Sequence, residues 1–240
     1  MNTSHYDYQS KYFDNVANQV FNHINDSSSK KELERFLKFL NLSDCSNLRI
    51  LEVGAGTGRY TIHLLDKGAY ITATEISKES LNNIEQQAIK INKHDRLNLV
   101  HDSLETPIMR ESFDLVFCVN LLHHVEDMDN VFKNMCEAAK KDAIIAIIEP
   151  NPLNLLFYID FFRKKNWSVE KGILKCTKNN LFNLFKKNKL EDIKLERYIM
   201  IPNFILNKFP FLKIIDQIML HVPIIKEFYM FHMIYAKKRG

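Results

Sequence analysis

The stretch "ILEVGAGTGRY", residues Ile50 to Tyr60, decides the fold class of this chain. It places three glycines, Gly54, Gly56 and Gly58, directly behind a short apolar run. A strand that ends in a glycine turn and continues as a helix presents backbone N–H groups to an anionic nucleotide. Dinucleotides, triphosphates and nucleoside sulfonium compounds all use such turns, so the neighbouring residues must discriminate among them.

The glycine spacing separates these ligand classes. No G-x-x-x-x-G-K-[ST] run is present, which excludes a triphosphate loop of that type. A dinucleotide turn needs G-x-G-x-x-G, and Arg59 occupies the position of its third glycine. The third glycine instead comes one residue earlier, so the spacing is G-x-G-x-G, preceded by the acidic Glu52. Alternatively, Gly54 and Gly56 serve only to form a tight turn.

Strands and helices are expected to alternate along the chain. The apolar patterns predict strands at residues 48–53, 69–75, 97–100, 113–120, 142–150, 193–200 and 227–238. They predict helices at residues 5–25, 26–40, 58–68, 77–92, 128–141, 153–165 and 177–188. Alternation with continuous apolar strands indicates a parallel sheet covered on both faces. We therefore expect an α/β fold with a doubly wound, mostly parallel seven-stranded sheet, an N-terminal helical cap over residues 1–45 and helical insertions near the C-terminus.

The composition is that of an ordinary globular chain, with 46% hydrophobic and 26% charged residues among 240. Residues 1–30 contain no apolar core segment, and no apolar run approaches the ~18 residues of a membrane span. We therefore expect neither a signal peptide nor a span, and a cytoplasmic location. Cys45, Cys118, Cys136 and Cys176 lie far apart, so neither a disulfide framework nor a metal site is expected.

Polar residues stand at the carboxyl ends of three predicted strands, where ligands bind in open α/β sheets. Glu75 ends the second strand, Asp102 follows the third, and Asn120 ends the fourth. The Glu75 carboxylate matches the two hydroxyls of a ribose, because two adjacent O–H donors fit its two oxygens. Alternatively, Glu75 is an acid favoured by a helix N-terminus and Asp102 is a solvated loop residue.

Taken together, five segments resemble the class I S-adenosylmethionine-dependent methyltransferases of the small-molecule type. They are "ILEVGAGTGRY", "ATEIS", "VHDSLE", "FDLVFCVNLLHHVED" and "AIIAIIEPNP", in this order between about residues 48 and 152. The resemblance implies a methyltransferase domain over residues 46–240, with a cofactor-binding half (46–150) and an acceptor-side half (151–240). It implies S-adenosyl-L-methionine as the cofactor, with Asp102 near the adenine amino group. The implied cofactor-binding residues are Tyr12, Glu52, Gly54, Ala55, Gly56, Thr57, Gly58, Glu75, Ile76, Asp102, Ser103 and Asn120.

The implied reaction is methyl transfer to a small-molecule or lipid-like acceptor by in-line displacement. Alignment of the reacting atoms alone can lower the activation barrier by ~7–11 kcal/mol, so a general base is not obligatory. If one is needed, His123 and His124 are candidates because imidazole titrates near neutrality, and Glu149 at the end of the fifth strand is another. Alternatively, the histidine pair has a packing or capping role.

The nature of the acceptor is inferred from the same segments. "VNLLHHV" differs from the Asn/Asp-Pro-Pro-aromatic motif that the family uses on nucleic acids, so no nucleic-acid substrate is expected. The stretch "HYDYQSKYFDNVA" (residues 5–17) resembles a flexible cap whose tyrosines close over the cofactor, or alternatively is a plain docking helix. A non-catalytic cofactor-binding protein of the same fold remains an alternative, as does a nicotinamide-dependent oxidoreductase. The oligomeric state is left open.

The charge is distributed unevenly. Residues 1–150 carry 16 Lys and Arg against 22 Asp and Glu, whereas residues 151–240 carry 17 against 7. A basic third favours an anionic substrate or membrane surface, and alternatively is a lysine-rich solvated surface. Residues 211–222 also show an apolar helical stripe. This stripe predicts a wall or lid of the acceptor pocket or, alternatively, a peripheral contact with an anionic membrane.

Overall fold

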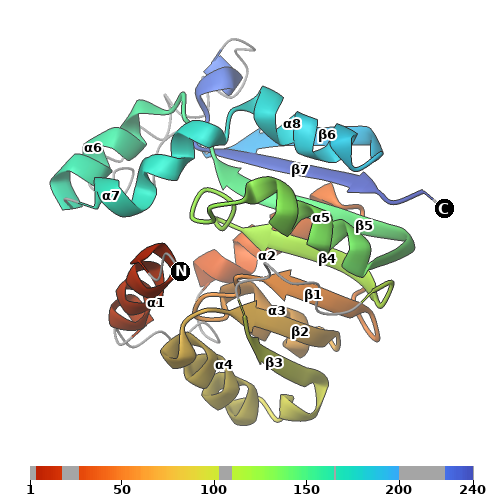
Figure 1. Ribbon diagram of the computed structural model, residues 1–240. Helices are drawn as coiled ribbons and strands as arrows, with labels where there is room; N and C mark the ends of the chain where they lie inside the picture. The colour runs from red at the N-terminus through yellow and green to blue at the C-terminus, as the bar shows by residue number, and fades with distance from the viewer. Residues whose placement is uncertain (1–3, 18–26, 103–109, 165, 200–224, 240) are drawn as a thin grey trace.

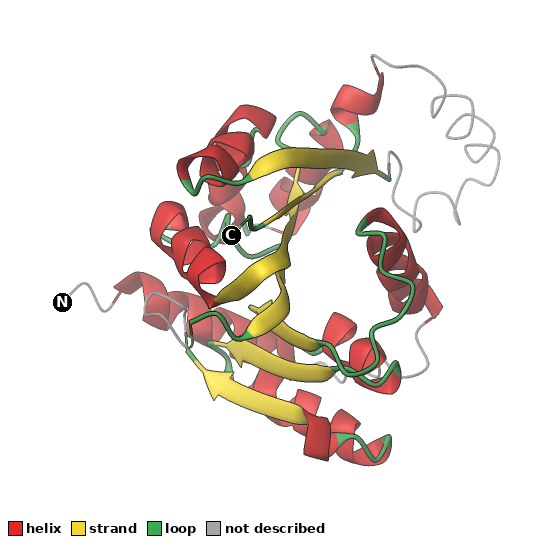
Figure 2. Ribbon diagram, turned by 90° about the vertical axis from the view of Figure 1, so that its right-hand side faces the viewer, coloured by secondary structure: helices red, strands yellow, loops and turns green. Residues whose placement is uncertain are grey.

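The computed structural model describes residues 4–17, 27–102, 110–164, 166–199 and 225–239, which form a twisted sheet between helices (Figures 1 and 2). The sheet has seven strands in the order β3-β2-β1-β4-β5-β7-β6. Their bounds are β1 Arg49–Val53, β2 Tyr70–Glu75, β3 Leu97–His101, β4 Phe113–Val119, β5 Ala139–Pro150, β6 Glu191–Tyr198 and β7 Phe231–Lys237. β7 runs antiparallel to β5 and β6, whereas the pairs from β3 to β5 are parallel. The prediction of a mostly parallel, seven-stranded α/β sheet is confirmed.

Helices cover both faces of this sheet. One layer comprises α2 Ser27–Phe39, α3 Arg59–Asp66 and α4 Lys78–Lys90, and the other comprises α5 Met128–Ala138 and α8 Lys178–Lys187. Successive side chains of a strand point to opposite faces. In β1, Ile50 therefore joins the core that contains Phe36 of α2, and Leu51 joins the core that contains Phe132 and Phe185 of the opposite layer. This arrangement explains why the central strands are apolar at almost every position.

The strand order places a ligand site between β1 and β4. From β1 the chain continues to β2 on one side and later returns to β4 on the other side, which makes this pair the switch point of the sheet. The carboxyl ends of parallel strands lie at the same sheet edge, so the glycine turn after β1 meets the segment after β4. The remaining helices, α1 Ser4–Ala17, α6 Leu155–Lys164 and α7 Trp167–Glu170, lie at one end of the sheet, on the left of Figure 1.

Two predicted boundaries were wrong. The helix predicted to end at residue 141 ends at Ala138, because Ala139 is already paired with Phe113 of β4. The final strand was predicted from residue 227, but residues Ile225–Phe228 form a short 3-10 turn, η3. The side chains of Asn151 and Asn154 hold this turn by donating hydrogen bonds to its backbone carbonyls.

A second set of differences concerns short elements. α7, the 3-10 turn η2 Lys171–Lys175 and the 3-10 turn η1 His94–Arg96 had no predicted counterpart, since none is long enough for a periodic pattern. The predicted helix 5–25 corresponds to α1 up to Ala17, and residues 18–26 lie outside the described ranges, as does the predicted helix 211–222. None of the helices in the described ranges combines the length and the apolarity needed to cross a membrane.

Candidate functional site

The glycine turn after β1 gives its three glycines different roles. Gly54, Gly56 and Gly58 have φ angles of +67°, +54° and +87°, a backbone conformation that favours glycine. A Cβ atom on Gly54 would lie 2.7 Å from Leu121 Cδ1, and one on Gly58 would lie 2.8 Å from Ile84 Cγ1. At Gly56, no heavy atom of the described residues lies within 4 Å of the Cβ position. Gly54 and Gly58 therefore permit close packing, whereas Gly56 borders open space.

The carboxylate of Glu75 at the end of β2 is oriented by backbone N–H groups. Its Oε2 accepts a hydrogen bond from Gly56 N at 2.8 Å, and its Oε1 accepts from Ile76 N at 2.8 Å and Ser77 N at 3.0 Å. Burial raises the pKa of Glu75, although these three hydrogen bonds oppose the shift. The carboxylate is thus held beside the glycine turn, with acceptor capacity remaining on Oε2.

Glu52 lies beneath the turn. Its side chain is buried, and Thr61 Oγ1 in the first turn of α3 donates a hydrogen bond to Glu52 Oε2 at 2.5 Å. Burial raises the pKa of Glu52 to about 8, although the Thr61 hydroxyl and the Arg59 guanidinium lower it. The structure therefore places Glu52 where it supports the start of α3.

The raised pKa of Glu52 has a measurable consequence for stability. The folded chain binds the proton of the Glu52 carboxyl group more tightly than the unfolded chain does. The stabilising contribution of this group is therefore complete below about pH 4.5 and is lost as the pH rises through about 8. The free energy of unfolding should fall between pH 5 and pH 8 by up to about 3 kcal/mol from this group. Urea titrations of Glu52→Gln should show a flatter profile, whereas the exposed Glu79→Gln should follow the wild type. An equal slope in Glu52→Gln would refute the assignment.

The other residues expected near the cofactor support the turn or border it. Ala55 N donates a hydrogen bond to Thr74 O at 2.9 Å, and Thr57 O accepts one from Gln87 Nε2 at 3.1 Å. The half-buried Asp102 follows β3 directly, and its backbone N donates to the carbonyl of Glu75 at 3.2 Å. Ser103, also expected here, lies outside the described residues.

Asn120 stands directly after β4 at the switch point. It has a φ angle of +52°, and its backbone N donates a hydrogen bond to Ile148 O at 2.8 Å. Its side-chain Oδ1 is buried and has no hydrogen-bond partner among the described residues. Burying an acceptor without a partner costs about 1–3 kcal/mol, so this oxygen favours a ligand that brings a donor.

Helix α1 links the two sides of the site. Ser10 Oγ donates a hydrogen bond to Ile76 O at 3.2 Å, and Ser77 Oγ donates one to Asp14 Oδ1 at 2.6 Å. Phe13 meets the ring of His124 edge-on, with the ring centroids 5.2 Å apart. The half-buried Tyr12 contacts this Phe13 ring in turn, at 5.3 Å. α1 therefore contacts both the end of β2 and the segment after β4.

Beyond Asn120, His123 is fixed by two carboxylates from distant parts of the chain. Its Nδ1 lies 2.7 Å from Glu149 Oε2 at the end of β5, and its Nε2 lies 3.4 Å from Glu170 Oε2 on α7. Burial opposes the charged ring, but the carboxylates of Glu149 and Glu170 outweigh it and raise the pKa of His123 to about 9. Glu149 also accepts hydrogen bonds from Leu121 N and Leu122 N, at 2.9 and 2.7 Å. Fully buried and fully engaged, Glu149 positions His123 and the turn around it.

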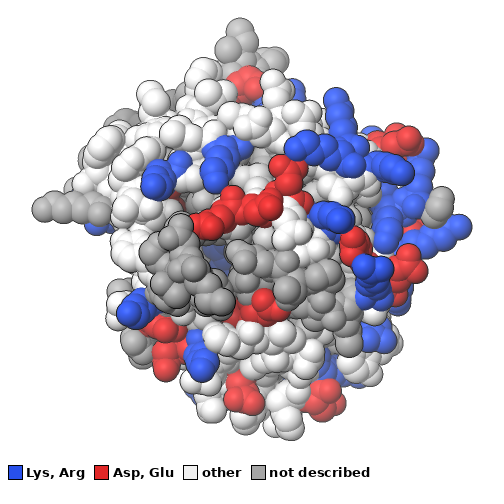
Figure 3. All heavy atoms as spheres, viewed as in Figure 1, with Lys and Arg blue, Asp and Glu red and all other residues white. Residues whose placement is uncertain are grey.

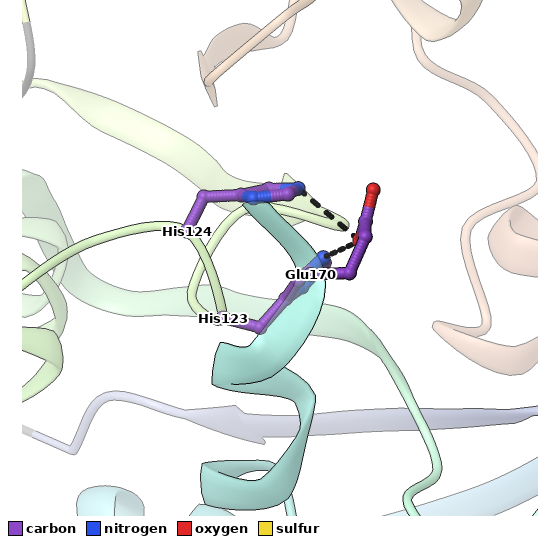
Figure 4. A group of neighbouring side chains, drawn as sticks. All are labelled: His123, His124 and Glu170. Atoms are coloured by element: carbon purple, nitrogen blue, oxygen red, sulfur yellow. Dashed lines mark ion pairs between the residues drawn. The ribbon is translucent and has the colours of Figure 1, made fainter. Parts of the chain in front are cut away.

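His124 stands beside His123 but in a different electrostatic state. Its ring centroid lies 3.9 Å from that of His123, and its Nε2 lies 4.0 Å from Glu170 Oε2. Burial and the neighbouring His123 lower the pKa of His124 to about 4. Both rings face Glu170 (Figure 4) although the two residues are adjacent in the chain, because residues 122–124 form a turn and not a regular helix or strand.

Three of the residues that complete this cluster were not found by sequence analysis. They are Glu170 on α7, Gly172 in η2 and Cys176, whose Sγ lies 3.7 Å from Glu149 Oε2. All three follow β5 in a segment without a recognisable motif. Only the fold, which returns this segment to the end of the sheet, could identify them.

The close approach of Gly172 gives a stability prediction. A Cβ atom on Gly172 would lie 1.7 Å from the carbonyl oxygen of His123, so the backbone of η2 must shift in Gly172→Ala. Overpacking of this kind costs roughly 1–3 kcal/mol. Urea unfolding should show this loss, whereas Lys171→Ala at the exposed neighbouring position should be within about 0.5 kcal/mol of the wild type. Wild-type stability in Gly172→Ala would show that η2 does not rest on His123.

Comparison with known proteins agrees with this geometry. Residues 51–145, from the glycine-turn strand to the middle of β5, match a family model described as a methyltransferase domain. The chain therefore contains a region similar to methyltransferase domains, over less than half of its length.

Curated relatives match over less than half of the chain. The ubiquinone biosynthesis O-methyltransferase of Rickettsia typhi is 30% identical over 109 residues, which cover 45% of this chain and 43% of the relative. The 27-O-demethylrifamycin SV methyltransferase of Amycolatopsis mediterranei is 26% identical over 113 residues, covering 45% and 42%. The matched region thus spans about two fifths of the length of these relatives.

Solved structures extend the likeness of the fold to most of the chain. Phosphoethanolamine N-methyltransferase 2 of Haemonchus contortus, in complex with S-adenosyl-L-methionine, superimposes with a TM-score of 0.66. The alignment covers 88% of this chain and 53% of that structure, at 19% sequence identity. The YcgJ protein of Bacillus subtilis has a TM-score of 0.62, with 88% and 99% covered at 16% identity.

Proposed function

We propose that this chain binds S-adenosyl-L-methionine and transfers its methyl group to a small-molecule or lipid-like acceptor. The observation that carries the proposal is the Glu75 carboxylate, which three backbone N–H groups orient beside the open space at Gly56. A ribose offers two adjacent hydroxyl donors to such a carboxylate. An unobstructed glycine next to it lets the rest of a nucleoside approach the backbone.

The remaining cofactor contacts follow the strand ends. Ile76 and Asp102 would border the adenine, and the buried Oδ1 of Asn120 would accept a hydrogen bond from the amino group of the cofactor's methionine part. Ala55 and Thr57 shape the turn, Glu52 supports it from below, and Ser103 and Tyr12 complete the proposed set. We further propose that α1 covers this site as the cap of residues 1–45, while residues 46–240 form the methyltransferase domain. Within residues 1–45, α2 packs on the sheet with α3 and α4.

When bound, the cofactor supplies an electrophilic methyl group on a sulfonium. The residues of this chain would hold the acceptor in line with that methyl group, and such alignment can lower the activation barrier by ~7–11 kcal/mol. Helix α1 would exclude water from the site, because Ser10, Phe13 and Asp14 hold it in contact with both sides. A hydroxyl or amine acceptor must also lose a proton, and we propose that the cluster of His123, His124 and Glu170 would face the acceptor and receive it.

The relatives support a small acceptor, because their names refer to ubiquinone biosynthesis and to a rifamycin precursor. Dinucleotide chemistry is disfavoured, since Arg59 replaces the third glycine and pairs with Glu32 of α2 at 3.0 Å. Calorimetry should show binding of S-adenosylmethionine and S-adenosylhomocysteine and negligible binding of NAD. The reverse result would overturn the proposal. Binding without methyl transfer to any phenol, catechol, carboxylate or amine would favour a non-catalytic protein of this fold.

We further propose that the protein makes peripheral contact with an anionic membrane. Leu155, Ile159 and Phe162 follow one another at helical spacing on α6 and are 73%, 64% and 72% exposed. Figure 3 shows Lys and Arg gathered toward α8 and the C-terminus, where Lys187 and Arg239 are paired with acids. The apolar face of α6 is therefore a better candidate for lipid contact than this basic surface. Ile159→Asp should reduce co-sedimentation with anionic vesicles severalfold. If the wild type does not sediment with such vesicles at low salt, the proposed membrane contact is wrong.

A further inference from the structure

The two histidines after β4 and the acid on α7 form a compact group of potential metal ligands. His123 Nε2, His124 Nε2 and Glu170 Oε2 lie within 4.8 Å of one another, and both rings face the carboxylate (Figure 4). They come from two parts of the chain, the turn after β4 and the end of α7. The fold therefore brings together two imidazoles and one carboxylate, a ligand set that suits first-row transition metals.

The distances within the group suit coordination better than direct hydrogen bonding. Glu170 Oε2 lies 3.4 Å from His123 Nε2 and 4.0 Å from His124 Nε2. Hydrogen bonds between nitrogen and oxygen have lengths of about 2.7–3.2 Å. Ligand atoms placed tetrahedrally at about 2.1 Å around one zinc ion are separated by roughly 3.4 Å. The spacing thus leaves room for one ion between the three atoms after a small adjustment.

The opposite nitrogen of His123 is held in the way typical of metal-binding histidines. Such a ring usually bonds to a carboxylate through the nitrogen that does not coordinate, which fixes its orientation and tautomer. His123 Nδ1 lies 2.7 Å from Glu149 Oε2, and Glu149 is itself fixed by Leu121 N and Leu122 N. The Nε2 atom of His123 is thereby directed toward Glu170.

The charges of the group and its contact with solvent also favour a bound metal ion. Glu149 and Glu170 place two carboxylates around two imidazoles in a buried region, and a dication that displaces the proton of His123 would neutralise both. The side chains of His123, His124 and Glu170 are 4%, 11% and 18% exposed, so the group keeps some contact with solvent at Glu170 and His124. The alternative set His123, Glu149 and Cys176 is buried throughout, which leaves no comparable access.

We propose that His123, His124 and Glu170 bind a divalent first-row transition metal, with Zn²⁺ or Mn²⁺ as the favoured ions. Three protein ligands leave at least one coordination position for water or for an acceptor oxygen. A metal there lowers the pKa of a coordinated hydroxyl, which would prepare an oxygen acceptor for methylation. This role in the reaction rests on the proposed function, whereas the metal site rests on the geometry alone.

The test measures metal binding directly. The full chain, stripped with a chelator and then freed of it, is titrated with Zn²⁺ by calorimetry and with Co²⁺ by visible absorption. We expect one ion per chain with micromolar or tighter affinity, and a Co²⁺ spectrum of low coordination number. Glu170→Gln and His124→Ala should each weaken binding at least tenfold, whereas His94→Ala, which removes an exposed histidine of η1, should not.

The outcomes are distinguishable from those for the cofactor. Binding of S-adenosylhomocysteine, measured on the same samples, should survive in Glu170→Gln and shows that this nearly isosteric variant is folded. Equal metal affinity in the wild type and Glu170→Gln, or no stoichiometric ion in the wild type, would overturn the metal site. Metal binding without cofactor binding would retain the metal site and reject the proposed function.

Discussion

Replacing Glu75 with alanine is expected to weaken the binding of S-adenosylmethionine roughly a hundredfold. The variant would lose the charge-assisted hydrogen bond that Oε2 can still accept from the ribose, worth ~1.5–3 kcal/mol, and 1.4 kcal/mol corresponds to a factor of ten. It would also release Gly56 N, Ile76 N and Ser77 N from the carboxylate that now organises them. Calorimetry with S-adenosylhomocysteine measures the change without the need for an acceptor.

The control for this prediction lies four residues further along the chain. Glu79 in the first turn of α4 is exposed, so Glu79→Ala removes a carboxylate from the same region without touching the turn. Its dissociation constant should stay within twofold of the wild type. Glu75→Gln keeps the shape of the side chain, and its dissociation constant should lie between those of Glu75→Ala and Glu79→Ala. An unchanged constant in a folded Glu75→Ala would show that the ribose binds elsewhere.

Gly56→Val is expected to abolish detectable cofactor binding, a loss of more than a hundredfold, while the chain remains folded. The side chain would enter the open space in which the cofactor is proposed to lie, since no described atom is within 4 Å of the Cβ position. The φ angle of +54° adds strain, because β-branched residues rarely adopt this conformation. Equilibrium dialysis with labelled cofactor, together with circular dichroism, would measure binding and folding.

Gly68 supplies a control matched for strain. Its φ angle is +85°, and a Cβ atom there would make ordinary contact with Ser46 at 3.6 Å, in the turn between α3 and β2. Gly68→Val should therefore lose a similar amount of stability but retain cofactor affinity. If both valine variants bind equally well, or if Gly56→Ala binds as tightly as the wild type, the space at Gly56 is not the cofactor site.

Much of the fold follows from local sequence because its signals are periodic or close together. Continuous apolar strands such as residues 144–148 indicate burial on both faces, and strand-helix alternation indicates parallel pairing. The glycine turn, Glu75 and Asn120 each stand within a residue or two of a strand end, so their meeting at one sheet edge could be predicted. The boundary errors at Ala139 and at η3 arise where a tertiary contact overrides a local preference.

By itself the sequence determined the class of the sheet, the position of the turn and the carboxylate beside it, since each depends on residues adjacent in the chain. Only the tertiary structure decided the roles of Glu149 and Glu170, which lie more than 20 residues from the histidines that they contact. It also decided that both His123 and His124 face one carboxylate. No periodicity links a turn after β4 to a short helix after β5, because their contact depends on how the intervening strand and helices pack against the sheet.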